Sequence, residues 1–160
     1  MEAWGNFFIA QVGASAALTG LVFVSVSISL SKILASPHLP DRAFQALVVL
    51  LQILVISSLM LVPSQMTSTL GIEVLAIAIA IWIMVVTFDI RSLRIAGSEY
   101  WQRAAFRMVL SQIAALLYVI AGGVIVSEGS IGIYLLVPAI ICSYVVALVD
   151  AWVLLVEINR

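Results

Sequence analysis

Apolar residues fill five long stretches of the chain, and polar residues gather in the short connections between them. A helix needs ~20 mostly apolar residues to cross a bilayer core of ~30 Å, and each stretch is long enough. The five predicted membrane-spanning helices cover approximately residues 7–34, 42–62, 72–94, 103–126 and 131–156. The pattern therefore predicts an all-α membrane protein, a bundle of five transmembrane helices that forms a single domain over residues 1–160.

The composition agrees with this fold class. Hydrophobic residues make up 64% of the chain and charged residues 9%, whereas about a quarter of a typical soluble chain is charged. The single cysteine, Cys142, has no partner for an internal disulfide. The amino terminus lacks the basic segment of a secretory signal, so we expect the first apolar stretch to be retained as a helix.

The basic residues predict an orientation. With five spans, alternate connections face the same compartment, and all seven basic residues fall on that side: Lys32, Arg42, Arg91, Arg94, Arg103, Arg107 and Arg160. The opposite side carries only acidic charges. The positive-inside rule then predicts that the amino terminus is outside and the carboxyl terminus is cytoplasmic.

The first predicted helix is unusually small and polar for a membrane span. One of its faces carries Gln11, Ser15, Ser25 and Ser29, which are candidates for lining a pore. The opposite face carries small residues suited to close helix packing, among them Gly13, Ala17, Gly20 and Ser27. Since neither face suits lipid, we expect this helix at the bundle centre or in a subunit interface. Tight packing alone explains the same pattern.

The fifth helix carries an acidic residue well inside the membrane. Ser143, Asp150 and Glu157 share one face at seven-residue spacing, and Asp150 lies ~10 Å inward of Glu157. A buried carboxylate is costly unless it is paired, hydrated or protonated. Asp150 is therefore a candidate for a cation site, a proton-transfer group or a charged pore ring. The alternative is a structural ion pair with Arg107.

Other polar residues within the apolar stretches are open to similar interpretations. For Asp89 we favour an ion pair with nearby arginines, namely Arg91, Arg94 or Arg103. Gln45 and Gln52 on the second helix, and Ser111 with Gln112 on the fourth, either bond to another helix or line a path. A shift of 61 residues aligns Asp89 with Asp150, which suggests, without establishing, that helices two–three and four–five are repeated hairpins.

Several chemistries lack the residues they need. The only histidine, His38, has no second histidine or cysteine near it in sequence, so we expect no zinc or haem site within one chain. No phosphate-binding loop is present, and no catalytic triad can be built around His38 with confidence. We therefore expect no enzyme activity, no cofactor and no nucleic-acid partner.

Two segments resemble a known group of proteins. The segment Trp4-Gly-Asn-Phe-Phe and the segment from Ala147 to Ile158, with the spacing of the spans, are similar to small multi-span integral membrane proteins of bacteria. The resemblance implies a bacterial origin, and together with the predicted spans it leads us to expect the cytoplasmic membrane as location. It implies no activity, and it assigns no functional residue.

Two functions remain open at this point. The leading hypothesis is a small homo-oligomeric channel or pore, selective for cations or protons if Asp150 faces the path. The alternative is a non-transporting subunit that scaffolds or regulates a larger complex through an unknown membrane partner. In both cases the lipid bilayer is the immediate environment.

Overall fold

The computed structural model describes residues 2–35, 39–95 and 101–158. His38 and Arg160, considered above, lie outside the described residues. The side chains of residues 2, 3, 94, 95, 101–104, 155, 157 and 158 are not described although their backbone is, and these include Arg94, Arg103 and Glu157.

The described residues form helices and the turns that join them, with no strand among them. In chain order the elements are α1 (Glu2–Ile28), α2 (Leu30–Leu34), α3 (Leu39–Leu59), α4 (Thr67–Ile95), α5 (Trp101–Glu128), the 3₁₀ turn η1 (Gly129–Gly132) and α6 (Ile133–Ile158). The all-helical prediction is confirmed.

Four segments of the described chain are long and apolar enough to cross a membrane: Trp4–Ile28, Leu39–Leu59, Thr67–Leu93 and Ala105–Leu154. The fourth segment is 50 residues long and includes most of α5, all of η1 and most of α6. By length and composition the helices are thus those of an integral membrane protein, as the sequence predicts.

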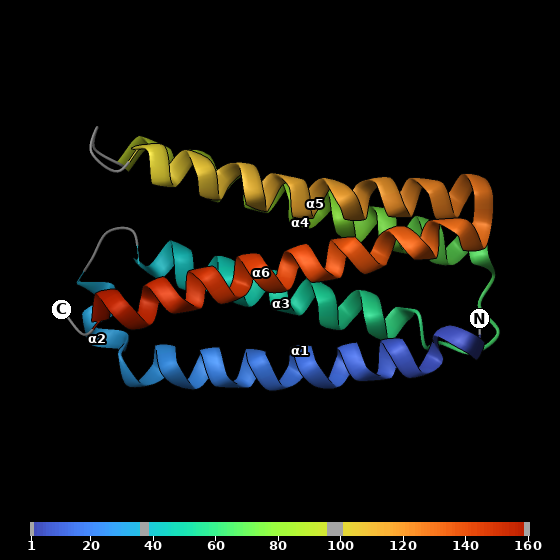
Figure 1. The fold of residues 1–160 in the computed structure, drawn as a ribbon, viewed down its shortest axis with the longest axis horizontal. Helices are drawn as coiled ribbons and strands as arrows, with labels where there is room; N and C mark the ends of the chain where they lie inside the picture. Colours follow the sequence, from blue (N-terminus) through green and yellow to red (C-terminus); the bar gives the residue numbers. More distant parts are fainter. Residues whose placement is uncertain (1, 36–38, 96–100, 159–160) are drawn as a thin grey trace.

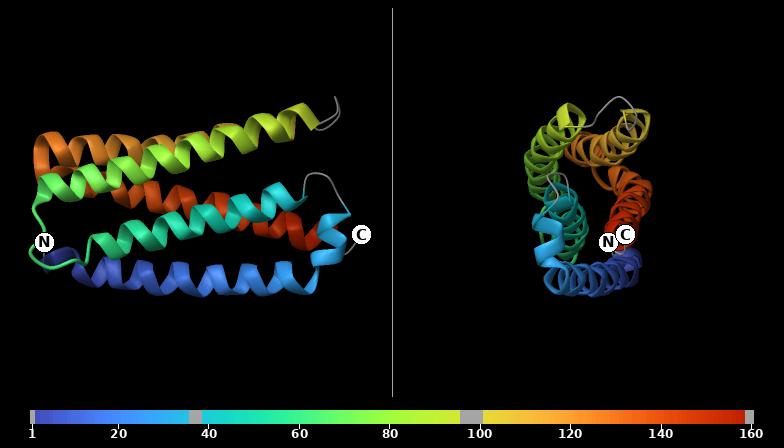
Figure 2. Two further views of the ribbon diagram at one scale, coloured as in Figure 1. Left: turned by 180° about the vertical axis from the view of Figure 1, so that it is seen from behind. Right: turned by 90° about the vertical axis from the view of Figure 1, so that its left-hand side faces the viewer.

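The long helices lie along one common axis (Figure 1). Seen along that axis, α4 and α5 form one pair, α3 and α6 lie beside them, and α1 lies at the edge against α3 (Figure 2). We call the end where α5 turns into α6 the η1 end, and the end where α6 finishes the α2 end (Figure 1). The expectation that the first helix occupies the bundle centre is therefore wrong for the single chain. Its place in a subunit interface stays a prediction.

Two local features shape the ends of the bundle. The predicted first helix is divided, since α1 ends at Ile28 and α2 begins at Leu30, with Ser29 at φ −107° between them. At the other end Gly129 has a φ of +71°, a left-handed conformation that glycine adopts at little cost. This turn reverses the chain from α5 into α6.

The helices α4 and α5 approach each other closely at Gly122. A Cβ atom built on Gly122 would lie 2.8 Å from the Cα of Leu75 in α4, which is closer than real contacts allow. A Cβ on the neighbouring Gly123 would meet nothing within 4 Å. Glycine at position 122 thus permits this approach.

The larger of two apolar clusters in the core lies mainly towards the η1 end, and the buried charges lie towards the α2 end, beside a smaller cluster of Ile33, Leu39, Ala43 and Leu154. Buried apolar side chains of one packed cluster, drawn from all five long helices, include Phe8, Ile56, Met60, Leu70, Val74, Ile125, Ile133 and Leu136. Beyond Tyr118 on α5, the interior side chains that follow, such as Ala121 and Ile125, are apolar. The charged residues of the interior lie on the other side of this cluster.

A buried charge network as candidate functional site

Four helices each direct a polar side chain into the interior near the α2 end. These side chains are Gln45 on α3, Asp89 on α4, Arg107 on α5 and Asp150 on α6, and all are buried. On α5, Ser111 follows Arg107 by four residues, so both point from the same face of the helix. Each residue lies on the inward face of its own apolar helix, and the fold therefore brings them together.

Asp89 is the best-bonded acid of this network. Its Oδ1 accepts hydrogen bonds from Gln45 Nε2 at 3.0 Å and from Arg107 Nη2 at 3.3 Å. Its Oδ2 accepts from Ser111 Oγ at 2.5 Å and from Gln112 Nε2 at 2.9 Å. With four donors from α3 and α5, the carboxylate of α4 ties three helices together, which is how a buried charge is normally satisfied.

Arg107 connects the two acids. Its Nη2 also donates to Gln45 Oε1, and its Nη1 lies 3.2 Å from Asp150 Oδ1 in an ion pair. The guanidinium is a rigid planar fork, so its two Nη groups reach different partners at once. One arginine of α5 therefore balances carboxylates from α4 and α6.

Asp150 differs from Asp89 in its hydrogen bonding. Its side chain is 1% exposed, but neither of its oxygens accepts a hydrogen bond from any described residue. Its favourable electrostatic partners are Arg107 and Arg42, while Asp89 opposes its charge. Among the described residues, Asp89 thus accepts four hydrogen bonds, whereas Asp150 is stabilised only by electrostatic attraction to arginines.

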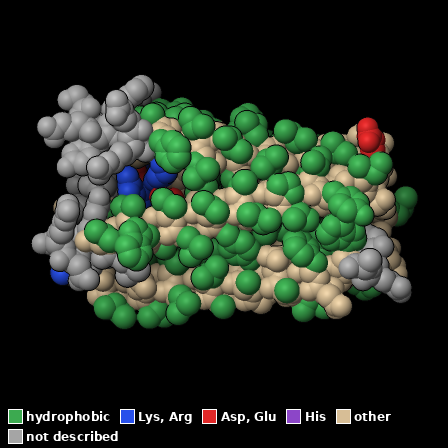
Figure 3. Space-filling view, viewed as in Figure 1, with side chains coloured by type: hydrophobic (Ala, Val, Ile, Leu, Met, Phe, Trp, Pro, Cys, Tyr) green, Lys and Arg blue, Asp and Glu red, His purple; other side chains and the backbone are tan. Residues whose placement is uncertain are grey.

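Part of the network reaches the surface. Figure 3 shows basic and acidic side chains in a recess towards the α2 end, with hydrophobic side chains beside it. The Arg107 side chain is 10% exposed, so the interior charges are not wholly sealed at this end.

The structure gives Asp89 a partner that the sequence did not suggest, Arg107, and corrects the expectation for Arg91, while the side chains of Arg94 and Arg103 are not described. The sequence suggested the arginines near it in the chain, but Arg91 instead pairs with Asp41, at 3.3 Å, in a more exposed position. Asp89 is 2% exposed and turns inward to Arg107. The sequence did contain a signal for this difference. Asp89 and Arg91 are two residues apart, and side chains two residues apart on a helix point in different directions.

The candidate pore residues of the first helix do not share one environment. Ser15 is fully buried and donates to the backbone oxygen of Gln11 at 2.7 Å, and Tyr144 donates to the same oxygen at 3.3 Å. Ser29 lies at the break between α1 and α2. The surroundings of these residues therefore differ from one position of the helix to the next.

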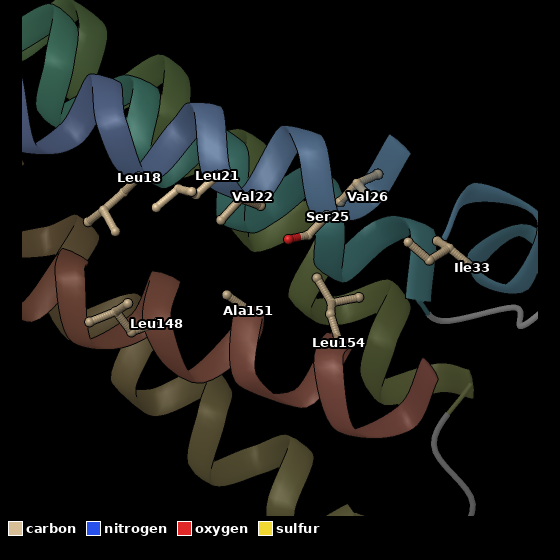
Figure 4. A pocket seen from close by; sticks show the side chains of 9 residues that line it. All are labelled: Leu18, Leu21, Val22, Ser25, Val26, Ile33, Leu148, Ala151 and Leu154. Atoms are coloured by element: carbon tan, nitrogen blue, oxygen red, sulfur yellow. The ribbon is translucent and has the colours of Figure 1, made fainter. Parts of the chain in front are cut away.

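Ser25 lies in a pocket of about 170 Å³ between α1 and α6. Figure 4 shows its hydroxyl among apolar side chains, and the lining is Leu18, Leu21, Val22, Ser25, Val26, Ile33, Leu148, Ala151 and Leu154. Ser25 is thus the single polar side chain of an apolar pocket.

The small residues proposed for helix packing lie on the outer side of α1. Gly13, Ala17, Gly20 and Ser27 are all exposed in the single chain. A Cβ added to Gly13 or Gly20 would meet nothing within 4 Å. This face is free to pack against something outside the chain.

Ser143 on α6 is buried, seven residues before Asp150 on the same helical face. The Glu157 side chain lies outside the described residues. Among the described residues no group of three or more His, Cys, Asp or Glu side chains is arranged to hold a metal ion.

Two members of the network, Gln45 and Ser111, were recognised from the sequence only as polar residues in apolar helices. Their seven- and four-residue spacings to other polar residues were the available signal. That both bond to Asp89 depends on how the helices are rotated, which the sequence does not show.

The fold and network together define an all-helical chain with apolar, membrane-type helices and a buried cluster of charges at one end of the bundle. No protein-family model, curated protein or solved structure matches this chain.

Proposed function

We propose that the chain is an integral membrane protein that forms a small proton-selective pore, with Asp150 as the proton-binding group. One observation carries the proposal: Asp150 is buried inside the bundle with both oxygens free of hydrogen bonds from the described residues. At Oδ2 a proton or a water molecule would displace no donor, while Oδ1 faces Arg107 Nη1 at 3.2 Å. Intramembrane acids of this kind commonly belong to ion or proton pathways.

The contrast with Asp89 supports this assignment. A proton added to Asp89 would have to displace one of its four hydrogen-bond donors. Asp150 loses only part of its attraction to Arg107. Of the two acids, Asp150 is the better proton acceptor on geometric grounds, and Asp89 is the better structural anchor.

In the proposed pore each chain crosses the membrane five times. The fourth apolar segment contains α5 with 28 residues and α6 with 26, and each is long enough for ~30 Å of hydrocarbon at 1.5 Å per residue. The left-handed Gly129 between them supports two crossings in opposite directions. The basic residues then favour an outer amino terminus and a cytoplasmic carboxyl terminus, in the bacterial cytoplasmic membrane.

The apolar cluster at the η1 end gives this pore a closed state. Hydrophobic constrictions in channels block conduction when they are dry and open when water enters. The buried apolar side chains around Val74, Ile125 and Leu136 lie towards the η1 end, where they could form such a hydrophobic constriction. We therefore expect a low flux that rises when the cluster loosens.

The outer face of α1 supports a homo-oligomer. Its exposed small residues allow the close backbone approach that drives helix association in lipid. In this arrangement α1 of one subunit meets α1 of the next.

Proton flux into liposomes tests the proposal. Purified protein is reconstituted with a pH-sensitive dye inside, and a potassium diffusion potential drives proton entry. We expect Asp150→Asn to lower the flux at least about tenfold, because a positioned proton-transfer group contributes on the order of 10²–10⁴ in rate. Asp41→Asn is the matched control, since it removes the same charge from a carboxylate that pairs with the exposed Arg91 and, among the described contacts, touches no member of the network.

Three outcomes would contradict the assignment. Equal flux in Asp150→Asn and wild type would remove Asp150 from the path. Flux of sodium or potassium as large as that of protons would replace the proton pore with a cation channel. No flux of any ion, with intact folding, would favour a non-transporting subunit.

The non-transporting alternative has an observation of its own. Among the described helices, α1 packs mainly on α3 and leaves most of its residues unburied. Such a helix suits a subunit that docks onto a partner in the membrane. In that case Asp150 and Arg107 act only as a structural pair, and Asp150→Asn would change stability without any flux to lose.

A further inference from the structure

Three helices repeat a buried polar residue seven positions closer to the η1 end. On α3 Gln45 is followed by Gln52, and on α5 Ser111 is followed by Tyr118. On α6, which runs the other way, Asp150 is preceded by Ser143. Seven residues are nearly two turns, so each pair shares a face and is separated by ~10 Å along the helix.

The second member of each pair is deeply buried. Gln52 is 2% exposed, Tyr118 is 0% and Ser143 is 1%. Tyr118 and Ser143 lie at matching distances from η1, one eleven residues before Gly129 and the other eleven after Gly132. The hydroxyl of Tyr118 is within interaction range of Ser143. The three residues therefore form a second polar layer inside the bundle.

This second layer has unused hydrogen-bonding capacity. Gln52 Nε2 and the Tyr118 hydroxyl make no hydrogen bond of normal geometry to any described residue. In the first layer Asp150 Oδ2 is in the same condition, and Asp150 Oδ1 and Arg107 Nη1 face each other in the ion pair without a hydrogen bond of normal geometry. Buried polar groups are almost always satisfied, and where protein does not satisfy them internal water does.

We infer that a file of internal water molecules runs between α3, α5 and α6, from Asp150 to Tyr118. Each water has polar partners from two or three helices, as buried waters require. The conducting role of this file rests on the proposed function: it would carry protons between Asp150 and the level of Tyr118. Its hydration does not depend on that function.

The file has an end inside the bundle. Tyr118 is ~16 Å from η1 by helix rise, and most interior side chains in that interval belong to the apolar cluster, with Ser57 on α3 as a buried polar exception. The pathway thus has a hydrated section of ~10 Å that begins at Asp150 and a dry section that continues to the η1 end. The dry section is where a gate would act.

X-ray-driven hydroxyl-radical footprinting tests the hydration directly on the wild-type protein in lipid. Radicals that form from a bound water modify the side chains that touch it, even where bulk water does not reach. We expect Tyr118 to be modified at a rate closer to that of Tyr134, which is 66% exposed, than to that of Phe8, which is 1% exposed and lies in the apolar cluster. Each rate is normalised to that of the unfolded protein.

Proton flux then tests whether the file conducts. Tyr118→Phe and Ser143→Ala each remove one hydroxyl from it, and we expect flux to fall about tenfold in each. Ser58→Ala is the matched control, because that hydroxyl is on the exposed side of α3 and bonds only to the Leu54 oxygen. Circular dichroism and gel filtration establish that the compared variants are folded.

The results separate the two ideas. If Tyr118 is as protected as Phe8, the water file is wrong whatever the flux. If Tyr118 is modified but wild-type protein passes no protons, the file stands and the proposed pore is wrong. If Tyr118 is modified and wild type conducts, but both folded variants conduct as well as Ser58→Ala, the file does not carry the protons.

Discussion

Arg107 Nη1 lies 3.2 Å from Asp150 Oδ1, and this contact joins α5 to α6 across the interior of the bundle. The same guanidinium lies 3.3 Å from Asp89 on α4, so one buried cation serves two buried anions. The three charges are therefore coupled, and removing each of them leaves a different set of buried charges behind.

Removal of Arg107 should be the most damaging single change in the network. Arg107→Gln leaves Asp89 and Asp150 buried without the cation between them, and breaking a buried pair in this way costs about 3–5 kcal/mol. Asp150→Asn should cost less, because Arg107 keeps Asp89 and Gln45. Unfolding in mixed micelles, followed by circular dichroism, measures both.

A surface arginine provides the control for this comparison. Arg91→Gln removes an arginine whose side chain is 67% exposed and should cost less than about 1 kcal/mol. If Asp150→Asn proves as destabilising as Arg107→Gln, the shared-cation arrangement is incorrect.

The coupling should appear in a double-mutant cycle. Once Asp150 is replaced by Asn, the loss of Arg107 strands one carboxylate instead of two. We therefore expect Arg107→Gln to cost about 1–3 kcal/mol less in that background than in wild type. Additive effects of the two changes would mean that the residues do not interact in the folded protein.

A charge swap should fail, for a reason that only the structure provides. Arg107→Asp combined with Asp150→Arg would restore one pair but place the new acid beside Asp89. Like charges so close in a buried site repel, so the double variant should be no more stable than the single ones. Thermal unfolding in detergent decides this, and full recovery by the swap would show that Asp89 is not part of the network.

Neighbouring glycines on α5 should respond in opposite ways to alanine. Gly122→Ala puts a Cβ 2.8 Å from the Leu75 backbone, so α4 and α5 must separate and stability should fall by about 1–3 kcal/mol. Gly123→Ala meets open space and should gain up to about 1 kcal/mol of helix propensity. Equal effects in an unfolding titration would refute the close α4–α5 approach.

The sequence predicted the helices well but only some of their contacts: it offered the Arg107–Asp150 pair as an alternative, and it missed the partner of Asp89. Long apolar stretches with polar breaks identify helices because length and hydropathy are local properties. The partner of Asp89 is not local: Arg107 is 18 residues away and on the next helix. Likewise the Gln/Ser pattern of α1 was visible, but its edge position depends on which other helices bury it. The rotation of each helix and the identity of its neighbours are set only when the bundle assembles.

The outer face of α1 should be a contact between subunits. In a Cys142→Ala background, which removes the only native thiol, cysteine at Ala17 or Gly20 should form disulfide-linked dimers when native membranes are oxidised. Both positions are exposed, and small residues there let two helices approach closely.

Ser15→Cys is the matched control for this experiment, since position 15 is on the same helix at a similar depth but is fully buried within the chain. It should give no cross-linked dimer at oxidant levels that link positions 17 and 20. Cross-linking from Ser15 alone would mean that α1 presents its other face to the neighbouring subunit. Monomers throughout, with cysteines shown to be reactive in detergent, would contradict a homo-oligomer built on α1.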